Sequence, residues 1–299
     1  MIAIFGPTGV GKTAVALALA ERLREAGEDP LAVSCDALQV YRGLETLTGA
    51  ASASDQERLE HRLLGFLAVT EAFSAGQFAD LAHEEIDSAL AARRLPIVVG
   101  GTGLYLRAAL CDLDLRPPPG VGVRERIEKE LGARGPEALH ADLEARAPAA
   151  AAATARGDRS RLVRALELLE MGEEPVPASD ESRLWTAETR HPTLLVGLLM
   201  GRDALYERID ARVDEMVAAG AEAEVRRAEA AGASRTARKA LGFDELLSGD
   251  VEAMKRRTRR YARRQLTWMR KLPEVHTIDV TGGREGEAAA RIEELLRRG

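Results

Sequence analysis

Short apolar runs alternate with longer segments of helical periodicity along the first third of the chain. The runs lie at residues 1–5, 31–35 and 96–99, and segments rich in Ala, Leu and Glu separate them. Brief apolar runs between helical segments are typical of strands buried on both faces of a parallel sheet. The pattern therefore predicts an α/β fold: a doubly wound, mostly parallel sheet with helices on both faces, the first helices being at 13–26 and 77–94.

The pattern changes near residue 115. Three prolines at 117–119 are followed by helical segments, and the next apolar run comes only at 194–200. A stiff connection followed by helices alone predicts a helical insertion domain, 115–190, within a core formed by 1–114 and 191–299. Beyond the run at 194–200, the periodicity predicts helices over 204–230, 236–247, 254–272 and 285–297, and a strand over 276–280.

The turn after the first apolar run has the pattern Gly-x-x-x-x-Gly-Lys-Thr. In a phosphate loop (P-loop) of this kind, backbone N–H groups surround phosphate oxygens, the lysine contacts the terminal phosphates and the hydroxyl holds Mg²⁺. The positive end of the following helix points at the same site. The motif predicts a nucleotide-type site for polyphosphate or pyrophosphate, with Thr13 as the Mg²⁺ ligand. Its residues are Gly6, Pro7, Thr8, Gly9, Val10, Gly11, Lys12 and Thr13.

Composition and charge narrow the class of protein. The net charge is −6, and no apolar run approaches the length that a membrane span requires. The two cysteines and five histidines lack the paired spacing of a zinc site. We therefore expect a cytoplasmic protein without a membrane partner, and the overall charge alone argues against binding to nucleic acid.

The distribution of basic residues changes that picture. Residues 255–271 carry nine basic side chains and no acidic one, in a segment without Gly or Pro. A charged run is usually a solvated helix face, but the lack of acidic residues within this one favours contact with a phosphate backbone. Two smaller basic clusters occur at 159–164 and 202–212. We therefore expect two anionic ligands, one small and one large.

Asp36 follows the second apolar run directly, where the strands of a parallel sheet place their ligands. A carboxylate there can hold Mg²⁺ or accept a proton from a nucleophile, although an isolated aspartate is often only a helix cap. The third run ends in Gly-Gly-Thr at 100–102, not in the aspartate typical of a motor or switch NTPase. That class is disfavoured, and Thr102 becomes a candidate phosphate ligand.

Several segments together resemble the bacterial tRNA dimethylallyltransferases, also called tRNA isopentenylpyrophosphate transferases. They follow the order of the family and span nearly the whole chain. Asp-x-x-Gln-Val-Tyr-Arg-Gly, Gly-Gly-Thr-Gly-Leu-Tyr and Tyr-Ala-Arg-Arg-Gln-x-Thr-Trp are far more specific than the phosphate loop. The segments are GPTGVGKT (6–13), SCDALQVYRGL (34–44), FSAGQF (73–78), PIVVGGTGLY (96–105), DRSRLVRALE (158–167), LYERIDARVDEM (205–216), ALGFDE (240–245) and TRRYARRQLTWMR (258–270).

The resemblance implies transfer of a dimethylallyl group from dimethylallyl diphosphate to the exocyclic amine of the adenosine next to the anticodon of tRNA, on its 3′ side. Pyrophosphate is released. Asp36 would be the base, Lys12, Thr13 and Thr102 would act with Mg²⁺ on the leaving pyrophosphate, and Arg124 would approach the substrates.

The resemblance also implies two sets of binding residues. Either Arg208 or Arg212 would contact the diphosphate or the tRNA. The residues that match tRNA-contacting stretches are Asp36, Ala37, Leu38, Gln39, Ser160, Arg161, Leu162, Val163, Arg164, Lys239, Gly242, Phe243, Arg263, Arg264, Gln265, Trp268 and Arg270.

The chain departs from the family pattern at three places. Residues 47–51 replace Gly-Thr-Ala-Lys-Pro, Arg62 replaces the second of two histidines, and Ser160 replaces a glutamine.

The alternatives to this function are a P-loop small-molecule kinase, a prenyltransferase of free adenine nucleotides and a noncatalytic RNA-binding module. The kinase and the nucleotide prenyltransferase would not need the basic segment 255–271. The intact phosphate loop argues against the noncatalytic module. No self-complementary surface pattern is visible, so we expect a monomer.

Overall fold

Six parallel strands form one sheet in this computed structural model, which describes all residues except 117, 121, 176–182 and 299. The strand order is β3-β2-β4-β1-β5-β6, and every pairing is parallel. The predicted α/β fold is confirmed. The strands are β1 (Ile2–Phe5), β2 (Pro30–Ser34), β3 (His61–Arg62), β4 (Leu95–Gly100), β5 (Leu194–Leu199) and β6 (His276–Asp279).

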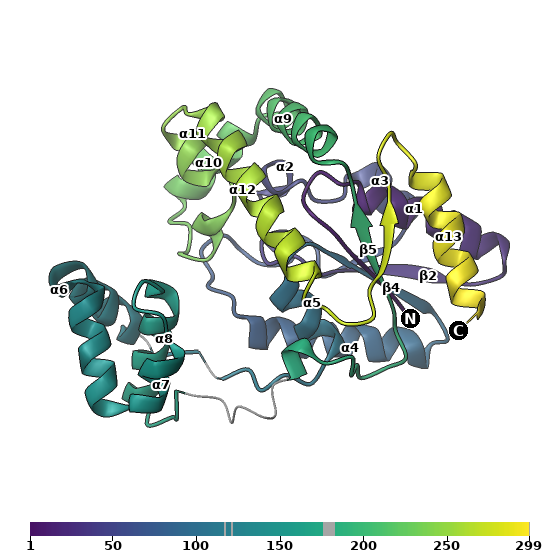
Figure 1. The fold of residues 1–299 in the computed structure, drawn as a ribbon. Helices are drawn as coiled ribbons and strands as arrows, with labels where there is room; N and C mark the ends of the chain where they lie inside the picture. The colour runs from purple at the N-terminus through teal and green to yellow at the C-terminus, as the bar shows by residue number, and fades with distance from the viewer. Residues whose placement is uncertain (117, 121, 176–182, 299) are drawn as a thin grey trace. The chain divides into compact units, whose positions relative to one another are not determined.

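Helices cover both faces of this sheet (Figure 1). On one face α1 packs against α13, and Ile2, Ile4 and Leu198 of the strands join their apolar side chains in a core without exposed surface. On the other face α4 packs against α5 and against β4. The helices are α1 (Lys12–Glu25), α2 (Glu45–Thr48), α3 (Ala53–Arg58), α4 (Ala75–Ala91), α5 (Gly103–Leu110) and α13 (Glu285–Arg298).

A group of helices between β5 and β6 differs in detail from the sequence-based expectation. The single helix predicted over 204–230 is wrong, because Gly220 takes a left-handed φ of 95° and divides it in two. The segment 236–247 likewise forms a 3₁₀ turn and a short helix that starts after Gly242. The elements are α9 (Arg202–Ala218), α10 (Ala221–Ala230), the 3₁₀ turn Ala237–Lys239, α11 (Phe243–Leu247) and α12 (Val251–Met269).

The chain divides into two compact units. The first comprises Met1–Leu113 and Leu184–Gly299, and the second comprises Asp114–Arg183. The segment 184–190, which the sequence analysis assigned to the insertion, therefore belongs to the first unit. The first proline of 117–119 and residues 176–182 of the insertion lie outside the described residues.

The second unit has its own apolar core, to which α6, α7 and α8 contribute. Leu139 and Leu143 of α6 and Leu162 of α8 are almost completely buried there. Among the described residues of the whole chain, no helix has the length and apolar character needed to cross a bilayer. The bounds are α6 (Val123–Arg146), α7 (Pro148–Ala153) and α8 (Arg159–Glu170).

Candidate active site

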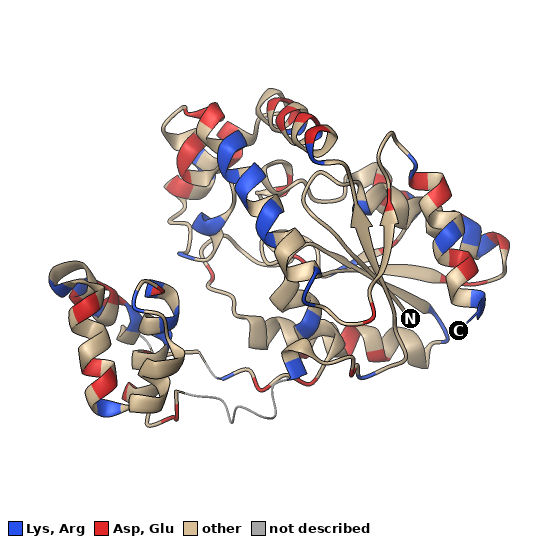
Figure 2. Cartoon of the chain, viewed as in Figure 1, with Lys and Arg blue, Asp and Glu red and all other residues tan. Residues whose placement is uncertain are grey.

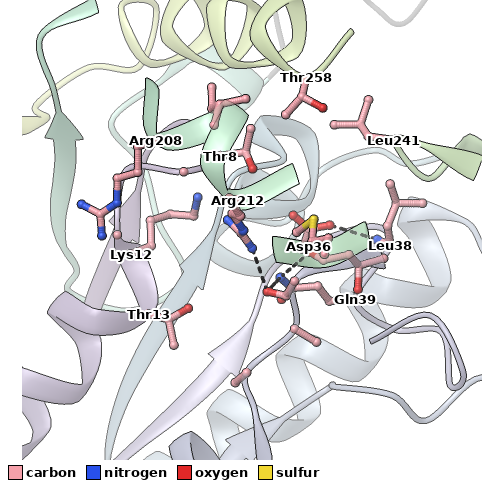
Figure 3. Close-up of a pocket in the computed structure, with 18 of the residues that line it drawn as sticks. Thr8, Lys12, Thr13, Asp36, Leu38, Gln39, Arg208, Arg212, Leu241 and Thr258 are labelled. Atoms are coloured by element: carbon pink, nitrogen blue, oxygen red, sulfur yellow. Dashed lines mark hydrogen bonds between the residues drawn. The ribbon is translucent and has the colours of Figure 1, made fainter. Parts of the chain in front are cut away.

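A cavity of about 700 Å³ lies in the first unit, where several parallel strands end (Figure 3). Loops that follow β1 and β2, the end of β4, and the helices α9 and α12 form its wall. The carboxyl ends of parallel strands are the usual place for ligands in open α/β sheets. Lining residues that bear on the chemistry are Thr8, Gly9, Gly11, Lys12, Thr13, Asp36, Leu38, Gln39, Gly100, Arg208, Arg212, Thr258, Tyr261 and Gln265.

The phosphate loop supplies one side of the cavity. Gly11 has a φ of 100°, a left-handed conformation that costs glycine little, and it serves as the N-cap of α1. The Lys12 ammonium donates hydrogen bonds to the carbonyl oxygens of Gly6 and Pro7, at 3.0 Å each. Lys12 therefore lies across the loop at the positive end of a 14-residue helix, where a phosphate group would bind.

Three charged side chains from different elements converge beside the loop: Lys12, Asp36 and Arg212 (Figure 3). Burial lowers the pKa of Lys12 to about 8, the Asp36 carboxylate acts in the opposite direction, and the Arg212 charge adds to the lowering. Burial also lowers the pKa of Arg212. Two desolvated cations share one carboxylate here, so an anionic ligand would stabilise the charged forms of both.

Asp36 is held by its own turn. Its Oδ1 accepts the N–H of Leu38 at 3.0 Å, and the residue is partly exposed to the cavity. Burial and the Asp36 charge raise the pKa of Tyr261 to about 12, so the Tyr261 phenol stays protonated. That phenol lies 3.2 Å from the Thr102 hydroxyl, with which it shares a hydrogen bond. Thr102 itself is not among the lining residues, and it reaches the cavity through Tyr261.

Both candidate arginines of α9 line the cavity, each with a partner. Arg208 forms a salt bridge of 3.0 Å with Glu285, and Arg212 donates to the carbonyl oxygen of Gly49 at 3.1 Å. Gln39 donates to the same carbonyl oxygen at 3.2 Å. The segment 47–51, where the chain departs from the family pattern, thus forms part of the cavity wall and fixes Arg212.

Gln265 has a role that the sequence analysis missed. Its side chain is 4 % exposed, its Oε1 accepts the Thr8 N–H at 2.8 Å, and its Nε2 donates to the Gly101 carbonyl oxygen at 2.7 Å. It links α12 to the phosphate loop and to the end of β4. These bonds give Gln265 a positioning role, and the expectation that its side chain contacts tRNA stays a prediction.

The other members of the tRNA set differ in burial, and their contacts with tRNA stay a prediction. Leu162 and Val163 lie in the core of the second unit, and Phe243 is completely buried in the first. Gly242 is buried as well, and Trp268 is partly exposed. The exposed members are Ser160, Arg161, Lys239, Arg263, Arg264 and Arg270, while Ala37, Leu38 and Gln39 are partly exposed.

Arg124 and Arg164 both lie in the second unit and share one carboxylate. Glu167 has no exposed surface, and it accepts salt bridges from Arg124 at 2.8 Å and from Arg164 at 3.1 Å. A buried carboxylate with two cations on it is strongly coupled to the fold around it. The structure therefore gives both arginines a structural partner within their own unit, and a contact with substrate stays a prediction.

The basic segment 255–271, which covers most of α12 and the two residues after it, has two halves with different electrostatics. In the first half, Lys255, Arg256, Arg257 and Arg259 pair with acidic residues of α9, of α11 and of the helix's own start, which corrects the expectation that the run is uncompensated (Figure 2). The cations of the second half have no acidic partner in the described part of the chain. They are Arg260, Arg263, Arg264, Arg270 and Lys271.

Thr13 is the residue that could hold a metal ion. Its hydroxyl lines the cavity and has no hydrogen-bond partner among the described residues. Those residues also contain no group of three His, Cys, Asp or Glu that could form a protein-only metal site. One hydroxyl fits Mg²⁺ that arrives with phosphate oxygens and keeps several of its waters, which is how this ion usually binds.

Comparisons with known proteins bear on the class of protein. A family model described as IPP transferase matches residues 39–272. The tRNA dimethylallyltransferase of Kineococcus radiotolerans is 41% identical over 309 residues, covering 99% of this chain and 96% of the relative. The enzyme of the same name from Geobacillus kaustophilus is 38% identical over 305 residues, covering 98% and 94%.

Two solved structures share the fold. The full-length tRNA isopentenylpyrophosphate transferase of Bacillus halodurans superposes with a TM-score of 0.67 at 32% identity, covering 100% of this chain and 99% of the other. A eukaryotic dimethylallyltransferase acting on tRNA gives a TM-score of 0.79 at 23% identity, covering 100% of this chain and 79% of the other. The second likeness concerns the fold alone.

Proposed function

The chain belongs to the IPP transferase family, and from that premise we propose that it transfers a dimethylallyl group from dimethylallyl diphosphate to tRNA. The acceptor is the exocyclic amine of the adenosine 3′-adjacent to the anticodon, and the second product is pyrophosphate. The observation that carries the proposal is one cavity in which the half-buried cations Lys12 and Arg212 lie beside the phosphate loop and the carboxylate of Asp36.

The phosphate loop stabilises the leaving group. Negative charge accumulates on pyrophosphate as its bond to the allylic carbon breaks, so preorganised N–H groups and cations lower the barrier. Lys12 and Arg212 supply the cations, and the N-terminus of α1 adds its dipole. Mg²⁺, held by Thr13 and by the diphosphate itself, would supply further charge neutralisation.

Asp36 prepares the nucleophile. An exocyclic amine is weakly nucleophilic, and it loses a proton as the new carbon–nitrogen bond forms, so a carboxylate that accepts this proton accelerates the step. The turn at Leu38 fixes the Asp36 carboxylate, and the neutral Tyr261 phenol is a hydrogen-bond donor in the same wall. The adenosine must leave its base stack to reach this cavity, as in other enzymes that modify a base.

RNA binding relies on the unpaired cations in the second half of the basic segment 255–271. Exposed guanidinium groups without acidic partners are available to phosphates, whereas paired ones would first have to break a salt bridge. We propose that the anticodon stem-loop contacts Arg263, Arg264 and Arg270, together with the exposed Ser160 and Arg161 of the second unit. We further propose that the protein acts as a cytoplasmic monomer, which light scattering on the purified chain tests.

Two reactions run in parallel test the proposal against the kinase alternative. The protein is incubated with unmodified tRNA, Mg²⁺ and either dimethylallyl diphosphate or ATP. We expect prenylated adenosine and pyrophosphate in the first reaction and no phosphoryl transfer in the second. Phosphoryl transfer from ATP without prenylated adenosine would refute it. Prenylation of free adenosine monophosphate in preference to tRNA would favour the nucleotide prenyltransferase instead.

A further inference from the structure

Trp185 is an exposed aromatic side chain on the surface of the first unit. It is 38 % exposed, and no other large hydrophobic residue is exposed in the described part of the chain. Its ring lies on that of Trp268, with the centroids 4.6 Å apart and the planes inclined by 42°. The Lys271 ammonium lies 5.3 Å from the centroid of the Trp185 ring.

The ring beneath Trp185 is fixed by close packing. A Cβ atom added at Gly103 would lie 2.3 Å from the Trp268 ring, so Trp268 packs directly on the turn after β4. Thr102 in that turn bonds to Tyr261, which lines the cavity. The exposed Trp185 ring therefore packs on a fixed Trp268 ring. Trp268 in turn contacts the turn that holds Thr102, and Thr102 bonds to Tyr261 in the cavity wall.

Four basic residues lie within five positions of Trp268 in the sequence. Arg263, Arg264, Arg270 and Lys271 are exposed, and none has an acidic partner among the described residues. Arg264 also lies over the Tyr261 ring, 5.4 Å from its centroid. Aromatic rings beside unpaired cations are the usual combination in proteins that bind single-stranded nucleic acid, because each base can stack while its phosphate meets a cation.

We propose that Trp185, supported by Trp268, stacks on an unpaired nucleobase of the RNA substrate, and that Lys271 and Arg270 bind the neighbouring phosphates. This inference rests on the proposed function, in which the large substrate is tRNA. An unpaired loop nucleotide fits because its face is free to stack, whereas the bases of a duplex already stack on one another. An acidic protein partner would need no flat ring at the centre of the contact.

The test compares Trp185→Ala and Trp185→Phe with the wild-type protein. One probe is an unmodified anticodon stem-loop RNA, and the other is a fully paired RNA duplex of equal length. We expect Trp185→Ala to weaken stem-loop binding by about five- to a hundredfold, the range found for a lost base stack, and to leave duplex binding unchanged. Trp185→Phe should retain most of the affinity, and affinity for pyrophosphate should be unchanged in both variants.

Stem-loop affinity that is unchanged in Trp185→Ala would overturn the inference. An equal loss for the stem-loop and the duplex would overturn it too, because a contact with the backbone or a change of fold would then explain the loss. Failure of the proposed function looks different. The wild-type protein would form no prenylated adenosine from any tRNA, while the loop-specific effect of Trp185→Ala on RNA binding would persist.

Discussion

Lys12, Thr13 and Asp36 line the cavity from the phosphate loop and the end of β2, and Arg212 and Tyr261 join them from α9 and α12. The phosphate loop is a local motif, and Asp36 directly follows a strand, so the sequence alone places Lys12, Thr13 and Asp36 at one sheet edge. Arg212 and Tyr261 reach the same cavity from distant parts of the chain. Nothing in their local sequence shows that they share it.

Replacing Asp36 with Asn tests its role as the base. The amide keeps an oxygen that can accept the Leu38 N–H, so the turn should persist, but it cannot take up the proton of the amine. We expect turnover to fall by about a hundredfold or more while tRNA binding stays unchanged. Single-turnover kinetics and a binding assay measure the two quantities separately. Unaltered turnover would leave Asp36 with a structural role only.

The lowered pKa of Lys12 makes diphosphate binding sensitive to alkaline pH. Lys12 in the free enzyme loses its charge above a pKa of about 8, although the reference value is 10.5. Since the anion needs the charged ammonium, the apparent Kd for Mg²⁺-pyrophosphate should rise by about tenfold per pH unit above that value. Calorimetric titration between pH 7 and 10 measures this rise.

The matched control for this experiment is Lys12→Arg, whose guanidinium stays charged over the whole range. The ionisation of pyrophosphate affects both proteins equally, so the ratio of their Kd values isolates Lys12. The lowered pKa of Lys12 also makes stability depend on pH. Between pH 8 and 10.5 the unfolded chain binds more protons at Lys12 than the folded chain does, so the free energy of unfolding rises with pH. Parallel Kd profiles for the two proteins would contradict the assignment.

At the scale of elements, α12 shows what the sequence could and could not establish. The lack of acidic residues within 255–271 is plain, yet the partners of its first half come from α9, α11 and Asp250. Those pairs exist only after the fold has formed. Short segments such as β3 (His61–Arg62) were missed for a related reason, because two residues carry no periodicity and depend on pairing with β2.

The two halves of α12 predict different effects on RNA binding. Arg263→Ala/Arg264→Ala removes two unpaired cations, and the slope of log K against log salt should become shallower by about 1.4–1.8. Arg256→Ala/Arg257→Ala is the matched control, since these residues pair with Asp250 and Glu245. It should leave the slope unchanged. Equal slopes in all three proteins would exclude phosphate contacts at 263 and 264.

Gln265→Leu tests the link between α12 and the phosphate loop. The change leaves the half-buried Thr8 N–H and the buried Gly101 carbonyl oxygen without their partner, and the loss at the buried oxygen costs about 1–3 kcal/mol. We expect lower thermal stability and weaker pyrophosphate binding, with RNA affinity little changed. Thr267→Ala on the exposed side of the same helix is the control. A selective loss of RNA affinity would instead make Gln265 a direct contact.

At the scale of the whole molecule, the hydrophobic periodicity predicts the fold better than it predicts the boundaries of the insertion. Alternating strands and helices define the parallel sheet, because each strand needs a crossover helix to reach the next. The segment 184–190 belongs to the first unit through contacts that have no sequence signature. The Arg190 backbone N–H donates to the Leu110 carbonyl oxygen at 2.8 Å. The Cys111 thiol donates to the Glu188 carbonyl oxygen at 3.1 Å.

Those two bonds hold the ends of the first unit close together, so residues 114–183 can be replaced by a linker. Leu113 and Leu184 each lie within four residues of one of those bonds, so about ten Gly and Ser residues, which reach about 33 Å, can join them. We expect the shortened protein to fold and to bind Mg²⁺-pyrophosphate as the full chain does, because the cavity lies in the first unit. Its affinity for the anticodon stem-loop should fall by about tenfold or more as the contacts of Ser160 and Arg161 are lost. Calorimetry and RNA binding measure the two properties. Full RNA affinity in the shortened protein would remove the second unit from the tRNA interface, and loss of pyrophosphate binding would mean that the cavity depends on it.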